Sequence, residues 1–203
     1  VYGLHNHFNA YLIRLYRQLH PQGKVYVKLD AGENIEELAV EDEILYLLST
    51  CTLVSAESEE VCRWLNRHWP FPVACIPNGT DFPSAERSVV YVEKQDVILT
   101  VGRLGTKQKA TEVLLEAFRL AAPRLPGWRL RLAGPLTPEF SPYVEGYFAR
   151  YPELRGRVEF IGELVDPDDL AQEYRRAKIF CLPSCWEGFA LVGPEAGRYG
   201  CAL

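Results

Sequence analysis

Two carboxylates near the end of the chain, Glu187 and Glu195, lie on either side of a short apolar segment. Glu187 and Glu195 are separated by seven mostly apolar or small residues in the stretch IFCLPSCWEGFALVGPEAGRYG, whose first part is typical of a buried strand. Pro194 suits the first turn of a helix, so Glu195 is predicted at a helix start and Glu187 in the loop before it. A carboxylate can accept hydrogen bonds from two neighbouring hydroxyl groups, as acids do when they bind a ribose or a hexose. As an isolated pair, the two acids are more simply explained as a surface-loop acid and a helix-start acid that the helix dipole favours.

A basic loop earlier in the chain is suited to an anion. In VGRLGTKQKATEVLLEAF, a strand is predicted to end at Gly102 and a helix to follow, with Arg103, Lys107 and Lys109 in the loop between them. Backbone N–H groups at a helix start, together with guanidinium and ammonium groups, form an anion site, most naturally for a diphosphate. A solvated basic loop without a ligand is the alternative.

The strands that precede these loops are expected to bring them to one edge of a sheet. From residue 24 onward, short apolar runs alternate with amphipathic stretches, which is the pattern of βαβ units and a parallel sheet. Ligands of open α/β sheets bind outside the carboxyl ends of the strands. We therefore expect the basic loop, the acidic segment and the segment LAGP to face one crevice. In LAGP, Gly134 would let a backbone or a ligand approach closely.

The alternation predicts two Rossmann-like domains. Residues 1–82 form the first domain, 83–96 a linker, and 97–203 the second domain. The predicted strands are 24–31, 52–56, 71–81, 97–102, 128–134, 157–162 and 178–183, and the predicted helices are 33–49, 57–69, 110–122 and 168–177. Neither half contains G-x-G-x-x-G or G-x-x-x-x-G-K-[ST], so dinucleotide and P-loop sites have no motif support.

Composition and spacing exclude several classes of function. The net charge of −5 argues against a nucleic-acid partner, whose phosphates call for a basic surface. The six cysteines form no C-x-x-C pairs, so we expect no zinc site. In VDPDDL, Asp166 and Asp168 have the spacing of a D-x-D metal motif, but Pro167 between them favours a helix start with Asp166 as its cap. We expect no metal.

The sequence shows no membrane span and no signal peptide, because its apolar runs are short and its N-terminus lacks a basic region followed by an apolar core. The default expectation is a cytoplasmic protein. The stretch YLIRLYRQLHPQGK (11–24) is consistent with an ordinary amphipathic helix, and the alternative is a helix that contacts a membrane surface.

Taken together, the motifs resemble those of the group 1 glycosyltransferases of the retaining GT-B class. The resemblance covers nearly all of residues 50–203 and includes LVSAESEEV, IPNGTDF, VGRL followed by QK and LLEAF, LRLAGP and VEFIGELVDPDDLAQEYRRAKIFCLPSCWEGFALVGPEAGRYG. Its most specific part is the E-x7-E element from Glu187 to Glu195. It implies an α/β fold of GT-B type, with two Rossmann-like domains whose parallel sheets face a central crevice, and a role such as polysaccharide biosynthesis.

The resemblance also implies residue roles. Arg103 and Lys109 would neutralise the diphosphate, with Lys107 as an alternative because the loop can be aligned in two ways. Glu187 would bind hydroxyls of the donor sugar, and Glu195 the nucleotide ribose. The backbone of Gly188 and Phe189 would assist Glu187, Gly134 would lie at the donor site, and His5 or His7 in GLHNH would lie on the acceptor side.

The implied activity is the transfer of a sugar from a nucleotide diphosphate to an acceptor hydroxyl on a glycan, a lipid-linked molecule or a small molecule, without a cofactor or a metal. Peripheral membrane contact would suit a lipid-linked acceptor. A non-catalytic module that binds a nucleotide sugar or a carbohydrate is the alternative. The resemblance implies a glycine-rich loop and a final helix outside residues 1–203, so we expect both domains to be incomplete and this chain alone to be inactive.

Overall fold

The computed structural model describes residues 7–29, 41–79 and 91–203, with two parallel sheets and helices around them. The chain divides into two compact units. The first comprises residues 1–79 together with 187–189, and the second comprises residues 80–186 and 190–203. None of the described helices is long and apolar enough to cross a membrane.

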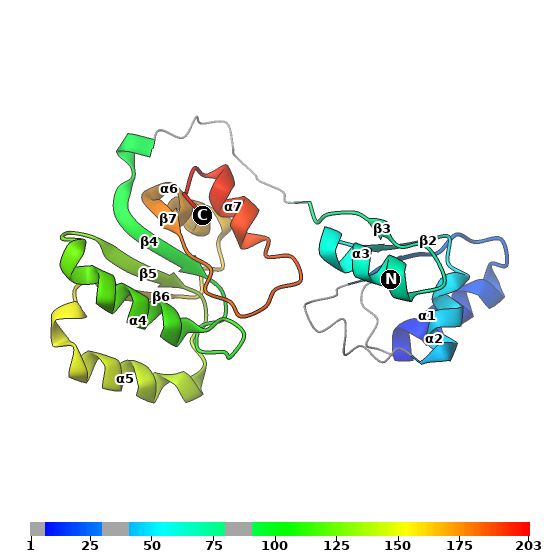
Figure 1. Cartoon of the computed structure of the whole chain (residues 1–203), viewed down its shortest axis with the longest axis horizontal. Helices are drawn as coiled ribbons and strands as arrows, with labels where there is room; N and C mark the ends of the chain where they lie inside the picture. Colours follow the sequence, from blue (N-terminus) through cyan, green and yellow to red (C-terminus); the bar gives the residue numbers. More distant parts are fainter. Residues whose placement is uncertain (1–6, 30–40, 80–90) are drawn as a thin grey trace. The chain divides into compact units, whose positions relative to one another are not determined.

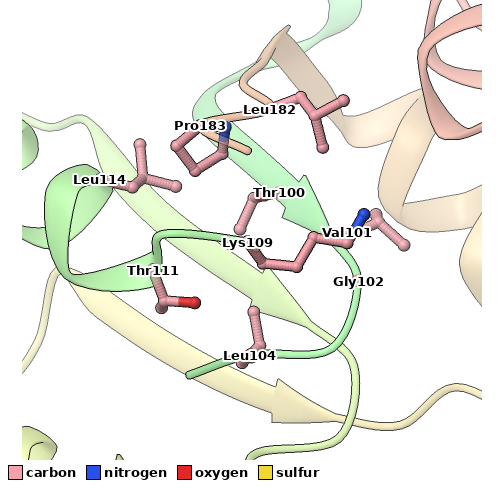
Figure 2. Close-up of a pocket in the computed structure, with 9 residues that line it drawn as sticks. All are labelled: Thr100, Val101, Gly102, Leu104, Lys109, Thr111, Leu114, Leu182 and Pro183. Carbon is pink, nitrogen blue, oxygen red and sulfur yellow. The ribbon is translucent and has the colours of Figure 1, made fainter. Parts of the chain in front are cut away.

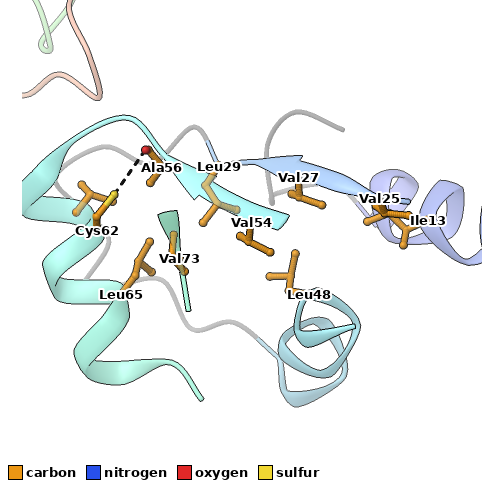
Figure 3. Close-up of a cluster of buried hydrophobic side chains, with 11 residues drawn as sticks. Ile13, Val25, Val27, Leu29, Leu48, Val54, Ala56, Cys62, Leu65 and Val73 are labelled. Atoms are coloured by element: carbon orange, nitrogen blue, oxygen red, sulfur yellow. Dashed lines mark hydrogen bonds between the residues drawn. The ribbon is translucent and has the colours of Figure 1, made fainter. Parts of the chain in front are cut away.

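The first unit contains a three-stranded parallel sheet in the order β1-β2-β3. Its elements are α1 (His7–Leu19), β1 (Tyr26–Lys28), α2 (Asp42–Ser49), β2 (Leu53–Ala56), α3 (Glu59–His68) and β3 (Ala74–Cys75). Figure 3 shows its core, in which Val27 and Val54 of adjacent strands pack with Leu48 of α2 and Leu65 of α3. The apolar residues of α3 recur at helical spacing, so one face of this helix is buried against the sheet.

The second unit contains a four-stranded parallel sheet in the order β6-β5-β4-β7 (Figure 1). Its strands are β4 (Gln95–Val101), β5 (Arg129–Ala133), β6 (Val158–Gly162) and β7 (Ala177–Phe180). Its α-helices are α4 (Thr111–Ala121), α5 (Ser141–Arg150), α6 (Pro167–Arg176) and α7 (Val192–Arg198). Four 3-10 turns, η2 (Tyr91–Glu93), η3 (Ala122–Arg124), η4 (Pro138–Phe140) and η5 (Pro152–Leu154), complete the described part of this unit.

Alternate residues of the central strands face opposite layers of helices, as the two-residue period of a strand requires. Leu130 and Leu132 of β5 belong to a buried cluster with residues of α4 and α5. Val97 and Leu99 of β4 belong to a second buried cluster with residues of α6 and α7. The sheet is therefore covered on both faces, which explains the apolar run VILTV of the central strand β4.

The strands and helices predicted in the second unit are present, with two main differences. The strand predicted from Val97 begins at Gln95, so the last two residues of the predicted linker belong to β4, and residues 83–90 of that linker lie outside the described residues. Helix α5 was not predicted, because Pro142 and Gly146 interrupt its helical pattern. In the first unit, the strand predicted over 71–81 is reduced to Ala74–Cys75.

Charged side chains occupy the α6 side of β5. Arg131 donates from Nε to Glu173 Oε2 at 2.6 Å and from Nη2 to Glu173 Oε1 at 2.9 Å, and it also pairs with Glu159. Arg176 donates to the same Glu173 at 2.8 Å. Glu173 is only 7% exposed. Because a buried carboxylate needs its partners to offset the loss of water, this cluster ties α6 to the sheet.

We expect Glu173→Gln to lower the free energy of unfolding by about 2 to 4 kcal/mol, since it leaves Arg131 partly buried with one carboxylate partner fewer. The matched control is Glu116→Gln, which breaks the more exposed pair between Glu116 and Arg119 within α4. That control should change stability by less than about 1 kcal/mol. Urea unfolding of both variants measures the difference. Equal losses of unfolding free energy would show that the cluster around Glu173 stabilises the fold no more than the exposed pair in α4.

Candidate functional site

The basic loop, the LAGP segment and the acidic segment all follow strands that lie side by side. Strand β4 pairs in parallel with β5 on one side and with β7 on the other. Beyond the strand ends, Gly102 N–H donates to the carbonyl oxygen of Ala133 at 3.0 Å, and Cys181 N–H donates to that of Leu99 at 2.8 Å. The three segments therefore begin at one edge of the sheet, where α/β proteins bind their ligands.

Gly134 allows a close approach between two backbones. Its φ is +132°, and a Cβ at this position would lie 1.9 Å from the carbonyl oxygen of Gly102. Its N–H donates to the carbonyl oxygen of Gly162 at 2.7 Å. The glycine is thus needed where the ends of β4, β5 and β6 pack together, and its role at a donor ligand stays a prediction.

Lys109 lies across the end of β4 (Figure 2). Its stem lines a small depression whose other residues are Thr100, Val101, Gly102, Leu104, Thr111, Leu114, Leu182 and Pro183. A Cβ at Gly102 would lie 3.2 Å from Lys109 Cε, so the lysine stem packs closely on the backbone there. The depression holds about 10 Å³, which is room for about one water. A larger ligand would therefore have to lie over the depression.

Gln108 joins the basic loop to the segment after β7. Its amide nitrogen donates to the carbonyl oxygen of Trp186 at 3.1 Å, and its backbone carbonyl accepts from the Cys185 N–H at 2.8 Å. Its amide oxygen accepts from Arg103 Nη2 at 3.3 Å. Arg103 and Lys107 are exposed. Gln108 was not predicted as a site residue, because it carries no charge and because Cys185 and Trp186, which it contacts, lie far away in the sequence.

The basic loop ends in a strained residue at the start of α4. Ala110, which precedes the helix, has a φ of +42°, in the left-handed region that favours glycine. Ala110 has no side-chain group that could cap this helix, and the Thr111 hydroxyl accepts from the Gly105 N–H at 2.8 Å. The loop is thus held in shape by its own backbone and by a threonine. It leaves the helix start uncapped next to the three cationic residues.

Glu195 lies on α7, which begins at Val192 and thus earlier than predicted from Pro194. Its Oε2 accepts a hydrogen bond of 2.8 Å from the hydroxyl of Tyr174 on α6. Glu187 lies in the loop between β7 and α7 and is half-buried, as are Gly188 and Phe189 in the same loop. Both acids therefore follow the same strand, and Tyr174 is a partner that was not predicted.

The remaining predicted residues have different outcomes. His5 lies outside the described residues, and His7 is the first residue of α1. Asp166 caps α6, and its carboxylate accepts from the Asp168 N–H at 2.9 Å, as predicted. Among the described residues, no group of three or more His, Cys, Asp or Glu side chains is arranged to hold a metal ion.

Comparison with known proteins identifies a family for the second part of the chain, although a stretch of 41 residues is also 49% identical to ribosomal RNA small subunit methyltransferase F of Citrobacter koseri, covering 20% of this chain and 9% of that protein. The family model described as glycosyl transferases group 1 matches residues 95–203. The chain is 31% identical over 103 residues to an uncharacterized glycosyltransferase of Haemophilus influenzae, covering 51% of this chain and 27% of that protein. It is 26% identical over 171 residues to D-inositol 3-phosphate glycosyltransferase of Corynebacterium glutamicum, covering 76% of this chain and 40% of that protein.

The fold is also found among solved structures. Anabaena Alr3699/HepE, solved in complex with UDP and glucose, matches with a TM-score of 0.65 at 20% identity, covering 98% of this chain and 57% of that one. Identity this low shows a shared fold alone. The chain spans less than half the length of the curated relatives that it matches.

We expect Gly134→Ala to lower the free energy of unfolding by about 3 kcal/mol or more, because the added methyl group meets backbone that has no room to move and the φ is unfavourable. The matched control is Gly146→Ala in α5, where a Cβ has nothing within 4 Å. It should raise stability by about 0.5 to 1 kcal/mol, the helix preference of alanine over glycine. Thermal unfolding of both variants checks the contrast, which disappears if β4 and β5 do not approach each other this closely.

Proposed function

Because the chain belongs to the group 1 glycosyltransferases, we propose that it binds a nucleotide diphosphate sugar and transfers the sugar to an acceptor hydroxyl. The observation that carries the proposal is that the loop with Arg103 and Lys109 and the segment with Glu187 and Glu195 begin at the same edge of one parallel sheet. Cations suit the diphosphate, and carboxylates suit the sugar and ribose hydroxyls. The UDP complex of Anabaena HepE is in keeping with such a donor.

The chemistry requires stabilisation of a leaving group. The bond between the anomeric carbon and the diphosphate breaks, and the acceptor oxygen bonds to that carbon while its proton is released. We propose that the new bond forms with retention, through an oxocarbenium-like transition state. Arg103, Lys109 and the uncapped start of α4 would stabilise the negative charge that grows on the diphosphate. The two cationic side chains can neutralise this negative charge, so we propose that no divalent metal ion is needed. Full activity in the presence of EDTA is the expected result.

The finer assignments belong to the same proposal. Residues 1–82 would form the acceptor-side domain and residues 97–203 the donor domain of a GT-B enzyme, with a linker between them. The acceptor would be a glycan, a lipid-linked molecule or a small molecule, used in a process such as polysaccharide biosynthesis. We place the protein in the cytoplasm, with peripheral membrane contact if its acceptor is lipid-linked.

A thermal-shift screen of the natural protein with UDP-, GDP-, ADP- and dTDP-sugars tests the proposal, because a ligand that binds only the folded state raises the melting temperature. One sugar nucleotide should raise it and should also be consumed when acceptors are added. Binding without consumption of any donor would favour a non-catalytic module. No shift with any donor would contradict the proposal. We further expect residues 1–203 alone to bind the nucleotide weakly or not at all and to transfer no sugar.

Arg103→Ala and Lys109→Ala should each weaken the binding of the nucleoside diphosphate by about 1.5 to 3 kcal/mol, the range for hydrogen bonds to charged groups. The matched control is Arg124→Ala in η3, an exposed cation beyond the far end of α4. It should leave binding unchanged. Isothermal titration measures these affinities and those for the matching nucleoside, which should be the same in all four proteins. A parallel loss of nucleoside affinity would mean that the loop has only a structural role.

The two acids should differ in the step that they affect. Glu195→Gln should weaken binding of the nucleotide, because ribose contacts are the same in the ground state and the transition state. Glu187→Gln should lower kcat more than it lowers nucleotide affinity, because it would contact the reacting sugar. Steady-state kinetics with a titration of the nucleotide separate the two effects. Equal losses of nucleotide affinity in both variants would contradict this division of roles.

A further inference from the structure

The hydroxyl of Tyr174 is directed at Glu195 from a rigid position. Tyr174 is 1% exposed, its ring is stacked on that of Tyr199 at 5.7 Å, and it packs against Phe180 at 6.0 Å. We propose that Tyr174 is a positioning residue that holds the Glu195 carboxylate for contact with the ribose of the donor, an inference that rests on the proposed function.

The backbone of Tyr174 is held as firmly as its ring. Its carbonyl oxygen accepts from the buried ammonium of Lys94 at 2.8 Å and from the thiol of Cys201 at 3.2 Å. Lys94 also donates to the carbonyl oxygen of Ala177 at 2.8 Å, so one cation binds several carbonyls at the C-terminal end of α6. The Tyr174 hydroxyl is thus held in place and can fix the position of a longer side chain that accepts a hydrogen bond from it.

Glu195 is the side chain whose position this hydrogen bond fixes. It is half-buried on a helix of 7 residues, and a free glutamate there would occupy several rotamers. The hydrogen bond of 2.8 Å from Tyr174 selects one of them before a ligand arrives. A group that is already in place loses less conformational entropy on binding, so the ligand binds more tightly.

The tyrosine also leaves the carboxylate able to accept further hydrogen bonds. Burial and the nearby charge of Glu195 raise the pKa of Tyr174, so its hydroxyl stays protonated and donates. The hydroxyl of Tyr174 bonds to Oε2 of Glu195 and not to Oε1. Oε1 can accept from a ribose hydroxyl. Because the tyrosine acts through Glu195, its removal should affect recognition of the ribose and not of the base or the diphosphate.

The test is Tyr174→Phe in the natural protein, which keeps the ring and removes only the hydroxyl. Isothermal titration compares UDP, GDP and ADP with their 2′,3′-dideoxy analogues. In the parent, the preferred ribonucleotide should bind at least about 10-fold more tightly than its dideoxy analogue, since it offers charge-assisted hydrogen bonds that the analogue lacks. In Tyr174→Phe, ribonucleotide affinity should fall about 5- to 10-fold and dideoxy affinity should stay within about 2-fold.

Tyr147→Phe is the matched control. Tyr147 is also a buried tyrosine, 4% exposed, and its hydroxyl donates to the carbonyl oxygen of Leu115 at 2.9 Å, within the other helical layer. Its loss should lower the melting temperature without changing the ratio of the two affinities. In a Glu195→Gln background, Tyr174→Phe should have little further effect on that ratio, because the two residues act as one unit.

The possible results distinguish a failure of the positioning role of Tyr174 from a failure of the proposed function. An unchanged ratio in Tyr174→Phe, or an equal loss for ribo and dideoxy nucleotides, overturns the positioning role while the proposed function stands. A parent that binds none of UDP, GDP and ADP overturns the inference, and it overturns the proposed function as well if no sugar nucleotide raises the melting temperature. A parent that binds a ribonucleotide and its dideoxy analogue equally overturns the ribose role of Glu195 and, with it, the role of Tyr174.

Discussion

The parallel pairing of β4 with β5 and β7 is the constraint on which the rest of the second unit depends. Val101 lies beside Ala133 and Leu99 beside Phe180, so three strands end at the same edge of the sheet. Because of that arrangement, the basic loop and the segment that carries Glu195 both begin at this edge, although they are distant in the sequence. It also requires the backbones after β4 and β5 to approach so closely that Gly134 has no room for a side chain.

The loop before α4 and the helix α6 contribute to the candidate site through a small number of polar contacts. Gln108 links the basic loop to the segment after β7, and Tyr174 links α6 to the acid on α7. In both contacts the donor is a neutral group: the Gln108 amide donates to a backbone carbonyl, and the Tyr174 hydroxyl donates to a carboxylate. Both contacts join elements that apolar packing already holds in place. Gln108 and Tyr174 thus provide preorganised hydrogen-bond partners for Arg103 and Glu195, the charged side chains that would contact a ligand.

Much of the fold and part of the candidate site could be predicted from local signals. The apolar runs located every strand of the second unit, and Asp166 before Pro167 marked the start of α6. Helix α5 was missed because Pro142 and Gly146 weaken its pattern, although both are tolerated where they lie. The candidate acids and cations were recognised by their charge. Gln108 and Tyr174 could not be found in this way, because their importance lies in contacts that only the tertiary structure creates.

The most direct measurement is a crystal structure of the natural protein with its preferred nucleoside diphosphate bound. If the account is right, the diphosphate oxygens lie within hydrogen-bonding distance of Arg103 or Lys109, beside the start of α4, and a ribose hydroxyl donates to Glu195 while Tyr174 keeps its hydrogen bond. A nucleotide bound away from the carboxyl edge of the sheet, or with its ribose far from Glu195, would contradict the account.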